Sequence, residues 1–272
     1  MKIPIDMPHY LSIVACMKNE ARNIEEWIEF HKKVGADHFY LYDNESTDNT
    51  EEILKPYVDA GDVSLFNTDM DTCQFACSYN ALTAFSDQSR WMAFIDLDEF
   101  FFSPKGDLIK ELKVFDEFTA GIAVNEVFFG SNSHLTRPEG GVLKNYTKRE
   151  KEINKHIKTV CQPIHTFCPS NNPHSFTYIK GFAVNEKREP CPGPFNEPAT
   201  ADIFRINHYW VKSKEEYEIK MNRGRADVPR RDPKFRYSQQ GRNIEEVFKK
   251  DNEIEDTLIL DYVKGKNTLR LV

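Results

Sequence analysis

The chain has 272 residues, of which 40% are hydrophobic and 29% charged, and its formal net charge is −7. A chain of this length buries roughly 70–75% of the surface that it exposes when unfolded, which allows a sizeable core. The excess of acidic residues excludes a protein whose whole surface binds nucleic acid. We expect one globular domain over residues 1–272, with an internal boundary near residue 120.

The start of the chain does not have the pattern of a secretory signal, because its apolar stretch is short and Asp6 and two prolines come early. No segment approaches the roughly 20 apolar residues of a membrane span. We therefore expect a cytoplasmic protein, in which cysteines are reduced thiols. Cys73 and Cys77, four residues apart on a predicted helix, are interpreted as core side chains.

A second group of cysteine and histidine residues has side chains of the types that bind zinc. The spacing of its members matches no standard zinc motif, so zinc binding is left open for this set: Cys161, His165, Cys168 and His174.

Strand and helix patterns alternate over the first hundred residues. Apolar runs predict strands at 11–17, 38–43, 62–66 and 91–96. Helical spacing predicts helices at 22–34, 50–60 and 73–86. This alternation favours right-handed crossovers and a mainly parallel sheet. The predicted fold class is α/β, with a Rossmann-like sheet flanked by helices.

The second half of the chain is less regular. We predict strands at 121–130 and 204–210, a charged helix at 212–225, and one or two helices within 243–272. Residues 131–200 are rich in Asn, Pro, Gly and Lys, which predicts loops with short strands.

Polar residues follow three of the predicted strands, at the point where each strand ends. They occupy 18–20, 43–48 and 96–99. In parallel sheets the carboxyl ends of the strands meet at one edge, and ligands bind there. We expect these polar residues to converge on one site.

Several common motifs are missing. The sequence has no GxGxxG after its first strand, no GxxxxGK[ST] and no GxSxG. Their absence argues against a dinucleotide oxidoreductase, a P-loop ATPase and a serine hydrolase. Phosphate groups at this sheet edge would need another positive partner, and a divalent cation held by carboxylates is the obvious one.

The stretch AFIDLDEFFF, residues 93–102, contains the acids that suit such a cation. Burying an unpaired carboxylate is costly, so acids at the edge of a core need a partner. In extended backbone, residues i and i+2 point to the same side, which predicts that Asp96 and Asp98 face one metal ion. The alternative is an acidic, solvated turn.

The chain resembles the nucleotide-sugar glycosyltransferases of GT-A fold, and most closely the family-2-like and family-92-like group with a DLDEF signature. The residues that carry this resemblance are ACMKNEARNIEEWIEFHKKVGADHFYLYDNESTDNT (15–50), FIDLDEFF (94–101) and INHYWVKSKEEYEIKMNRGRA (206–226). Residues 131–200 match only loosely. By this resemblance, 1–120 would bind the nucleotide-sugar donor and 121–272 would form the acceptor side.

The resemblance implies roles for particular residues. The metal ligands would be Asp96, Asp98 and His208, and this mixed oxygen and nitrogen set suits Mn²⁺ or Mg²⁺. The nucleotide-sugar would be bound by Asn19, Glu20, Asp43, Asn44, Ser46, Asp48, Gln74, Asn80, Asp96, Arg223 and Arg225.

Some of these residues also have a plain structural interpretation. Ser46 and Asp48 have side chains that shape turns and cap helices. Gln74 and Asn80 are equally compatible with the polar edge of a packed helix. These alternatives are left open by the sequence.

The reaction implied is transfer of a hexose of the galactose or glucose type from a UDP-linked donor, with inversion. A carboxylate would take the acceptor's proton. Glu126, in VNEVFFGSN, is the first candidate for this base, and Glu186, Glu197 and Asp202 are its rivals. His174 is a candidate for the wall of the acceptor pocket.

The expected acceptor is a glycan or a lipid-linked saccharide in surface polysaccharide or lipopolysaccharide synthesis, and no nucleic acid partner is expected. The basic run 223–236 suits a charged acceptor or an anionic membrane, so peripheral contact with the inner face of a membrane is part of the hypothesis. Two other classes stay open. One is a sugar nucleotidyltransferase or metal phosphohydrolase, and the other is a non-catalytic glycan-binding module.

Overall fold

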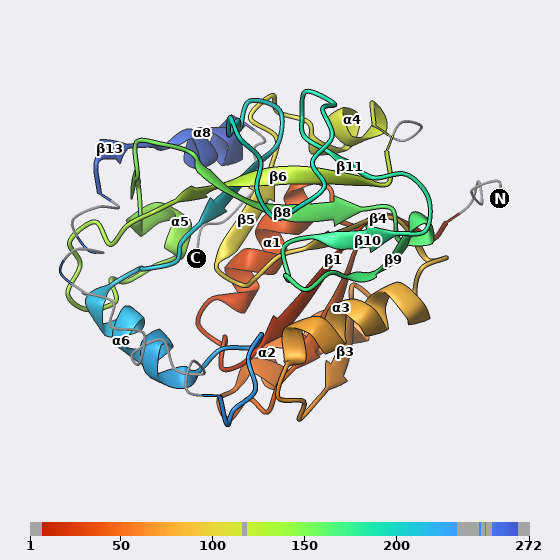
Figure 1. Ribbon diagram of the computed structural model, residues 1–272. Helices are drawn as coiled ribbons and strands as arrows, with labels where there is room; N and C mark the ends of the chain where they lie inside the picture. The colour runs from red at the N-terminus through yellow and green to blue at the C-terminus, as the bar shows by residue number, and fades with distance from the viewer. Residues whose placement is uncertain (1–6, 116–118, 233–244, 246–247, 249–251, 266–272) are drawn as a thin grey trace.

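The computed structural model describes residues 7–115, 119–232, 245, 248 and 252–265 (Figure 1). Among these residues, one large sheet contains the strands β1 (His9–Met17), β2 (His38–Asp43), β3 (Val63–Asn67), β4 (Ser89–Phe94), β5 (Glu99–Phe102), β6 (Gly121–Phe128), β8 (Asn154–Cys161), β11 (Ala183–Val184) and β12 (Arg205–His208). Neighbouring strands follow the order β3-β2-β1-β4-β8-β6-β12-β5, and β11 lies beside β6.

The first four strands are parallel to one another and have the order 3-2-1-4. This is the start of the Rossmann strand order. The predicted helices between these strands are present as α1 (Ile24–Val34), α2 (Thr50–Asp59) and α3 (Cys73–Ala84). The prediction of an α/β fold with a mainly parallel sheet flanked by helices is confirmed.

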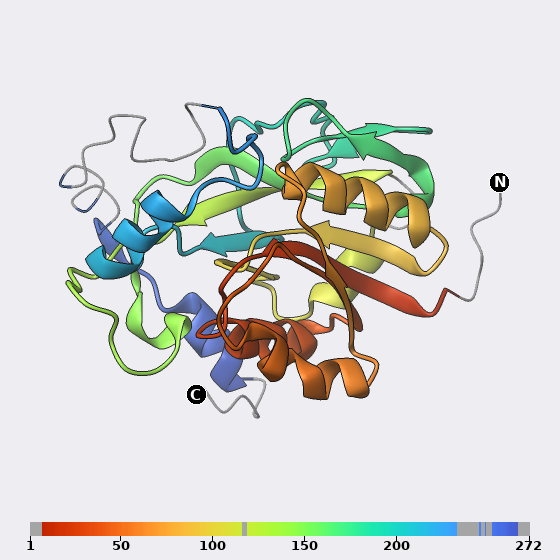
Figure 2. The same ribbon diagram turned by 90° about the horizontal axis from the view of Figure 1, so that it is seen from below.

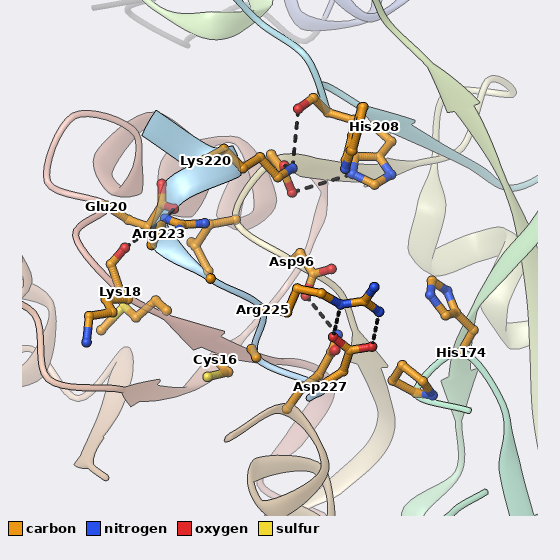
Figure 3. A pocket seen from close by; sticks show the side chains of 18 of the residues that line it. Cys16, Lys18, Glu20, Asp96, His174, His208, Lys220, Arg223, Arg225 and Asp227 are labelled. Carbon is orange, nitrogen blue, oxygen red and sulfur yellow. Dashed lines mark hydrogen bonds and ion pairs between the residues drawn. The ribbon is translucent and has the colours of Figure 1, made fainter. Parts of the chain in front are cut away.

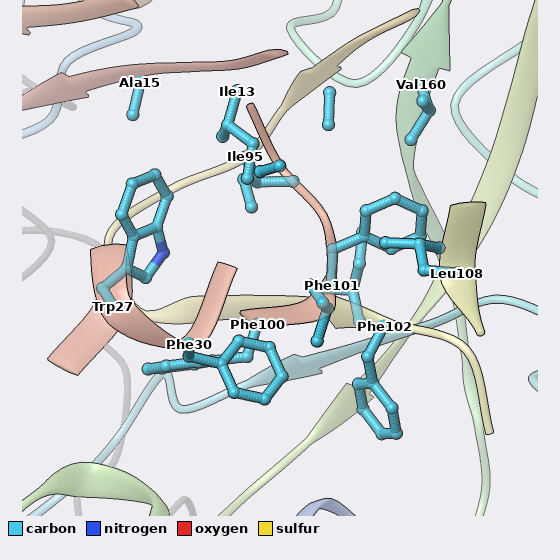
Figure 4. Packing of buried hydrophobic residues seen from close by; sticks show 14 of the residues in the cluster. Ile13, Ala15, Trp27, Phe30, Ile95, Phe100, Phe101, Phe102, Leu108 and Val160 are labelled. Atoms are coloured by element: carbon cyan, nitrogen blue, oxygen red, sulfur yellow. The ribbon is translucent and has the colours of Figure 1, made fainter. Parts of the chain in front are cut away.

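The helices cover both faces of the sheet. Figure 2 shows α1 and α2 below the sheet and α3 above it. On the lower face, Trp27 and Phe30 of α1 pack with β-strand residues such as Ile13 in the main core (Figure 4). On the upper face, buried residues of α3 pack against Val14 and Tyr40 in a second cluster.

The turn after α1 shows how sequence fixes the local geometry. Gly35 adopts φ 110°, and its N–H donates to the carbonyl oxygens of His31 and Lys32. A side chain at this position would be strained, and its Cβ would lie 2.5 Å from Ile109 Cγ1. Glycine therefore ends the helix here as the sequence predicted.

The second half of the chain adds strands to the same sheet. β8 runs antiparallel between β4 and β6, whereas β12 is parallel to β6. The prediction that 131–200 would form loops with short strands is wrong for β8, which has eight residues and lies in the middle of the sheet. Its polar residues concealed it, because Lys158 is buried there beside acidic partners.

The remaining elements lie around this sheet. Two small sheets pair β9 (Thr166–Pro169) with β10 (Phe176–Tyr178), and β7 (Lys148–Arg149) with β13 (Ile254–Glu255). The short helices are α4 (Leu108–Lys113), α5 (Val142–Asn145) and the 3-10 helix η1 (Pro163–His165).

Two later predictions agree with the structure in type and position. The charged helix is α6 (Lys214–Arg223), and the terminal helix is α8 (Leu258–Gly265), whose Ile259 and Val263 reach the main core. The rest of the interval predicted as one or two terminal helices lies largely outside the described residues. No helix in the described part of the chain has the length and apolar character needed to span a membrane.

One expectation about the cysteines is wrong. Cys16, at the end of β1, and Cys73, the first residue of α3, form a disulfide. The expectation of reduced thiols came from the inferred compartment, whereas folding brings these two residues together from 57 positions apart. Cys73 and Cys77 are both buried as predicted, with their sulfur atoms 3.2 Å apart.

A buried histidine joins α1 to the edge strand β5. His31 Nδ1 lies 2.8 Å from the Trp27 carbonyl oxygen, which only accepts, so Nδ1 carries the proton. His31 Nε2 accepts from the Phe101 N–H at 3.1 Å. Burial lowers the pKa of His31 from 6.5 to about 3, so the ring is neutral in the folded protein.

We predict that His31→Leu lowers the free energy of unfolding at pH 7.5 by about 1–3 kcal/mol, because the buried Phe101 N–H loses its acceptor. Below pH 6.5 the unfolded wild type binds a proton at His31 that the folded protein does not bind. The free energy of unfolding of the wild type therefore falls by about 2 kcal/mol between pH 6.5 and 5, and the variant lacks this loss. The difference between the two proteins should therefore shrink as pH falls. Urea unfolding at both pH values measures this, and a constant difference would contradict the assignment.

Candidate active site

A cavity of about 650 Å³ opens at the carboxyl ends of the parallel strands (Figure 3). Its walls come from the end of β1, the turn between β4 and β5, the ends of β6 and β12, the start of β8, and the segment that contains α6 and the residues after it. The convergence that the sequence predicted for the polar residues is therefore present for part of the set. The polar residues of that set that line the cavity are Lys18, Glu20, Asn44, Asp96 and Asp98. Other predicted site residues that line it are Gln74, Glu126, His208, Arg223 and Arg225.

The acidic turn of residues 96–99 is held by its backbone. The indole N–H of Trp27 donates to the Glu99 carbonyl oxygen at 2.8 Å and to the Asp96 carbonyl oxygen at 3.2 Å. The Tyr209 N–H donates to the Asp98 carbonyl oxygen at 2.8 Å. These bonds fix the turn from α1 on one side and from the end of β12 on the other.

The two aspartates of this turn have different partners. The segment is a turn rather than extended backbone, which corrects the premise of the i, i+2 prediction. Asp96 is bound by Lys158 Nζ at 2.7 Å and by Gln74 Nε2 at 3.2 Å. Asp98 faces Lys220 Nζ at 2.5 Å and His208 Nε2 at 3.6 Å. Burial opposes the charge of Asp98, but Lys220 and His208 hold its pKa well below the usual range.

His208 lies between acidic side chains. Its Nδ1 is 2.7 Å from Glu126 Oε1, and because a carboxylate only accepts, Nδ1 carries a proton. This leaves Nε2 directed toward Asp98. Burial would lower the pKa of His208, but Glu99, Asp98 and Glu126 together raise it to about 10.

Glu99 is the residue that joins Asp98 and His208 in a candidate metal site. Ligand atoms of these three side chains all lie within 4.8 Å of one another. Glu99 Oε1 is buried without a hydrogen bond, with Lys158 Nζ 3.2 Å and His208 Nδ1 3.4 Å away. Burial raises the pKa of Glu99 well above its usual range, and Asp96 adds to this.

Lys158 is a residue of this site that was not predicted from the sequence. Its side chain is only 3% exposed, and Asp96 and Glu99 surround its ammonium group. Burial opposes its charge, but Asp96, Glu99 and Glu126 raise its pKa above the usual value. No sequence signal could have identified it, because its acidic partners come from other strands. Lys220 on α6 was missed for the same reason.

The donor atoms of this site suit a divalent cation. Four carboxylates, from Asp96, Asp98, Glu99 and Glu126, face two lysine ammonium groups and His208. The acidic neighbours that raise the pKa of His208 to about 10 stabilise positive charge at this point, and a cation bound at Nε2 would replace the second proton of the ring. The buried Glu99 oxygen and the oxygen and nitrogen donors of the set fit such an ion.

The other end of the cavity is basic. Arg223 donates to Glu20 Oε1 at 2.6 Å, and Arg225 forms an ion pair with Asp227. Arg230 pairs with Asp71 at 3.2 Å and with Glu45. These arginines, predicted as part of a basic run, lie at the cavity with Cys16 and Met17 of β1. Residues 233–236 of the run lie outside the described residues.

Five predicted donor residues do not line the main cavity. Asn19 and Ser46 bond the loops after β1 and β2 together, since the Asn19 N–H donates to Ser46 Oγ at 2.8 Å. Asp43 accepts from the Ser46 N–H, and Asp48 from the Ala21 N–H. These contacts support the turn-shaping interpretation of this loop. The fifth residue, Asn80 on α3, accepts from the hydroxyl of Tyr42 on β2.

The rivals of Glu126 as base lie away from the cavity. Glu186 accepts the backbone N–H groups of Asp202, Ile203 and Phe204, which is a structural role. Neither Glu197 nor Asp202 is among the described residues that line the cavity. Glu126 does line it, but its carboxylate is occupied by His208. Its role as base stays a prediction.

The zinc-type set of the sequence does not form a compact ligand group. Among the described residues, the groups with atoms close enough for one metal ion are Asp98 with Glu99 and His208, and the three cysteines Cys16, Cys73 and Cys77. His174, a member of the zinc-type set, instead lines the cavity, as expected for the acceptor wall.

The strand order and the acidic cavity at the strand ends are those of a GT-A fold. More specifically, the chain belongs to glycosyltransferase family 92, whose family model matches residues 12–189. The resemblance stated from the sequence is confirmed.

Curated relatives of this chain are plant proteins. It is 27% identical over 222 residues to glycosyltransferase family 92 protein RCOM_0530710 of Ricinus communis, covering 78% of this chain and 38% of that protein. It is 25% identical over 208 residues to galactan beta-1,4-galactosyltransferase GALS3 of Arabidopsis thaliana, covering 65% of this chain and 41% of that protein. The chain thus spans well under half the length of these relatives.

Among solved structures, the chain is similar to S. aureus TarS 1-349 in complex with UDP, with 15% identity and a TM-score of 0.37. The similar region covers 44% of this chain and 36% of that one. That score is too low to support a conclusion about this chain.

We predict that Lys158→Met lowers the free energy of unfolding by about 3–5 kcal/mol, because Glu99 and Asp96 lose their buried cation. Lys155→Met is the matched control, since Lys155 lies on the same strand but is exposed. Urea unfolding followed by circular dichroism gives both values. An equal, small loss in the two variants would show that Lys158 does not offset the charge of the acidic turn.

Proposed function

We propose that this chain is a metal-dependent glycosyltransferase that moves a hexose from a nucleotide diphosphate sugar, of UDP type, to a glycan or lipid-linked saccharide. The observation that carries the proposal is the cavity itself, with a basic end and an acidic metal-type cluster facing one space. Membership of glycosyltransferase family 92 supports the class of reaction.

The donor would lie with its diphosphate between the two ends of the cavity. Arg223 and Arg225 are the proposed partners of the phosphate groups. Their guanidinium groups bind carboxylate oxygens at the cavity wall, and phosphate oxygens are bound by the same N–H groups. A diphosphate would compete with Glu20 and Asp227 for these arginines. The nucleoside would then reach toward Asn44 and the end of β1.

The ligands of Mn²⁺ or Mg²⁺ would be Asp98, Glu99 and His208. Asp96 would support the site through its ion pair with Lys158. When bound, the ion stabilises negative charge on the leaving diphosphate. Glu126 keeps the Nδ1 proton of His208 in place and so leaves Nε2 available as a ligand. Lys220 holds Asp98 from the other side.

The donor sugar is proposed to be galactose or glucose, with inversion at its anomeric carbon. Support comes from the relative named galactan beta-1,4-galactosyltransferase, because a β-linked product from an α-linked nucleotide sugar requires inversion. The acceptor oxygen bonds to the anomeric carbon while the bond from that carbon to the phosphate oxygen breaks. The acceptor's proton passes to a base on the cavity wall.

The cellular setting is proposed from class alone. The hypothesis is a cytoplasmic enzyme of surface polysaccharide or lipopolysaccharide synthesis. It would be peripheral at the inner face of a membrane. Three arginines of the basic run, Arg223, Arg225 and Arg230, pair with carboxylates and line the cavity, so these three do not support membrane contact.

The alternative functions are less well supported. A nucleotidyltransferase or metal phosphohydrolase would use the same acids, but the family assignment favours glycosyl transfer. A non-catalytic glycan-binding module has no need for a buried cluster of four carboxylates with two lysines.

We predict that UDP-galactose or UDP-glucose binds only with Mn²⁺ or Mg²⁺, and that Asp98→Asn abolishes this metal-dependent binding. The substitution removes a charged ligand while keeping the side chain's shape and hydrogen-bonding capacity. Calorimetric titration of UDP, GDP and both UDP-sugars, each with and without Mn²⁺, measures it.

Asp59→Asn serves as the control for that titration, because Asp59 is exposed at the end of α2 and forms an ion pair with Lys55, away from the cavity. Binding of no nucleotide by the wild type under either condition would overturn the proposed function. Full metal-dependent binding by the Asp98 variant would remove Asp98 from the metal site.

A further inference from the structure

His174 is a half-buried histidine that lines the cavity and that the metal and donor sites do not use. It follows Pro173 in the loop before β10, and both residues line the cavity. Figure 3 shows its ring projecting from the wall opposite Glu20 and Lys18, below His208.

The loop holds His174 rigidly. The His174 N–H donates to Asn172 Oδ1 at 2.9 Å, and its carbonyl oxygen accepts from the Thr159 hydroxyl at 2.8 Å. Its Nδ1 lies 2.8 Å from the carbonyl oxygen of Ile157 on β8. The backbone and one ring nitrogen are therefore both fixed to β8 or to the loop itself.

These contacts determine the tautomer. A carbonyl oxygen only accepts, so the proton of a neutral His174 is on Nδ1 and the lone pair is on Nε2. The ring is thus presented to the cavity in the form that accepts a proton. His208 also carries a proton on Nδ1, but acidic neighbours raise its pKa to about 10 and its Nε2 faces Asp98.

Glu126 is less suited to the same task. Its Oε1 accepts from His208 Nδ1 at 2.7 Å, so one of its oxygens positions that ring, and the residue is only 1% exposed. A base must be within hydrogen-bond reach of the proton that it takes. Of the two side chains, His174 is the less buried, and its Nε2 is the ring nitrogen that the Ile157 carbonyl oxygen does not engage.

We propose that His174 is the general base of the glycosyl transfer, with Nε2 accepting the proton of the acceptor hydroxyl, and that Glu126 is a positioning residue for His208. The inference rests on the proposed function. As the acceptor oxygen bonds to the anomeric carbon, its hydrogen moves to Nε2, and the electron pair of the breaking bond leaves on the diphosphate. His174 then returns the proton to water.

The electrostatic surroundings are consistent with a neutral ring at rest. Burial lowers the pKa of His174 from 6.5, and Lys158 lowers it further, whereas Glu126 and Asp96 raise it. The other ring beside it is His156, with centroids 5.8 Å apart. Because the net direction is downward, His174 is unprotonated at pH 7, and its basic form is lost only as pH falls below 6.5.

The test uses His174→Asn, whose side-chain amide can still donate to the Ile157 carbonyl oxygen. With Mn²⁺, UDP-galactose and a β-1,4-linked galacto-oligosaccharide, kcat for transfer should fall by about 100-fold or more. The donor KM should change by less than about threefold, because the ground-state contacts to the donor are retained. His165→Asn is the matched control, since His165 does not line the cavity.

A companion pair of variants separates the two roles. His174→Ala should regain part of its activity when imidazole is added, since a free base can occupy the vacated space. Glu126→Gln should weaken Mn²⁺ binding, because the amide is a poorer partner for the His208 N–H. Transfer by His174→Asn within threefold of wild type, or loss of transfer in Glu126→Gln with unchanged Mn²⁺ binding, would overturn the proposal.

The tautomer is measurable without any substrate. Nitrogen-15 spectra of the folded protein at pH 7 should show His174 protonated at Nδ1 and free at Nε2. The opposite tautomer, or a doubly protonated ring, would overturn the inference even if the galactose donor proves wrong. Failure of the wild type to bind UDP-sugars would instead count against the proposed function and leave this result standing.

Discussion

The site depends on one constraint, which is the cost of placing four carboxylates together at the edge of a core. Unpaired charges there would destabilise the fold. The chain meets this cost with Lys158 from β8, Lys220 from α6 and His208 from β12. Each cation comes from a different element, so the acidic turn can be stable only when the sheet and α6 are assembled. A divalent cation that replaced the second proton of His208 would take over part of this compensation.

The same arrangement links folding to chemistry. Trp27 on α1 binds the backbone of the acidic turn, and His31, one helical turn later, binds the strand that follows it. The helix that covers one face of the sheet thus also sets where the carboxylates lie. Two histidines at the cavity carry their proton on Nδ1, but their partners differ. A carboxylate holds His208 toward the metal-type cluster, whereas a backbone carbonyl holds His174 toward open space.

Local patterns predicted the elements that depend on short-range order. The alternation of strands and helices up to residue 96, the glycine after α1 and the charged helix α6 all follow from periodicity and capping. The pattern failed at β8, because a buried lysine makes a central strand look exposed. It also failed for the disulfide of Cys16, whose partner lies 57 residues away. Neither feature has a signal within one window of sequence.

The sequence by itself determined the α/β class, the family resemblance and the presence of acids where parallel strands end. These properties follow from the order of residues along the chain, because a strand ends where its apolar run ends. Only the tertiary structure decided which charges meet. It placed Glu99 rather than Asp96 beside Asp98 and His208, engaged Glu126 with a histidine, and left His174 facing the cavity. Such pairings depend on distances between separate elements, which no local pattern encodes.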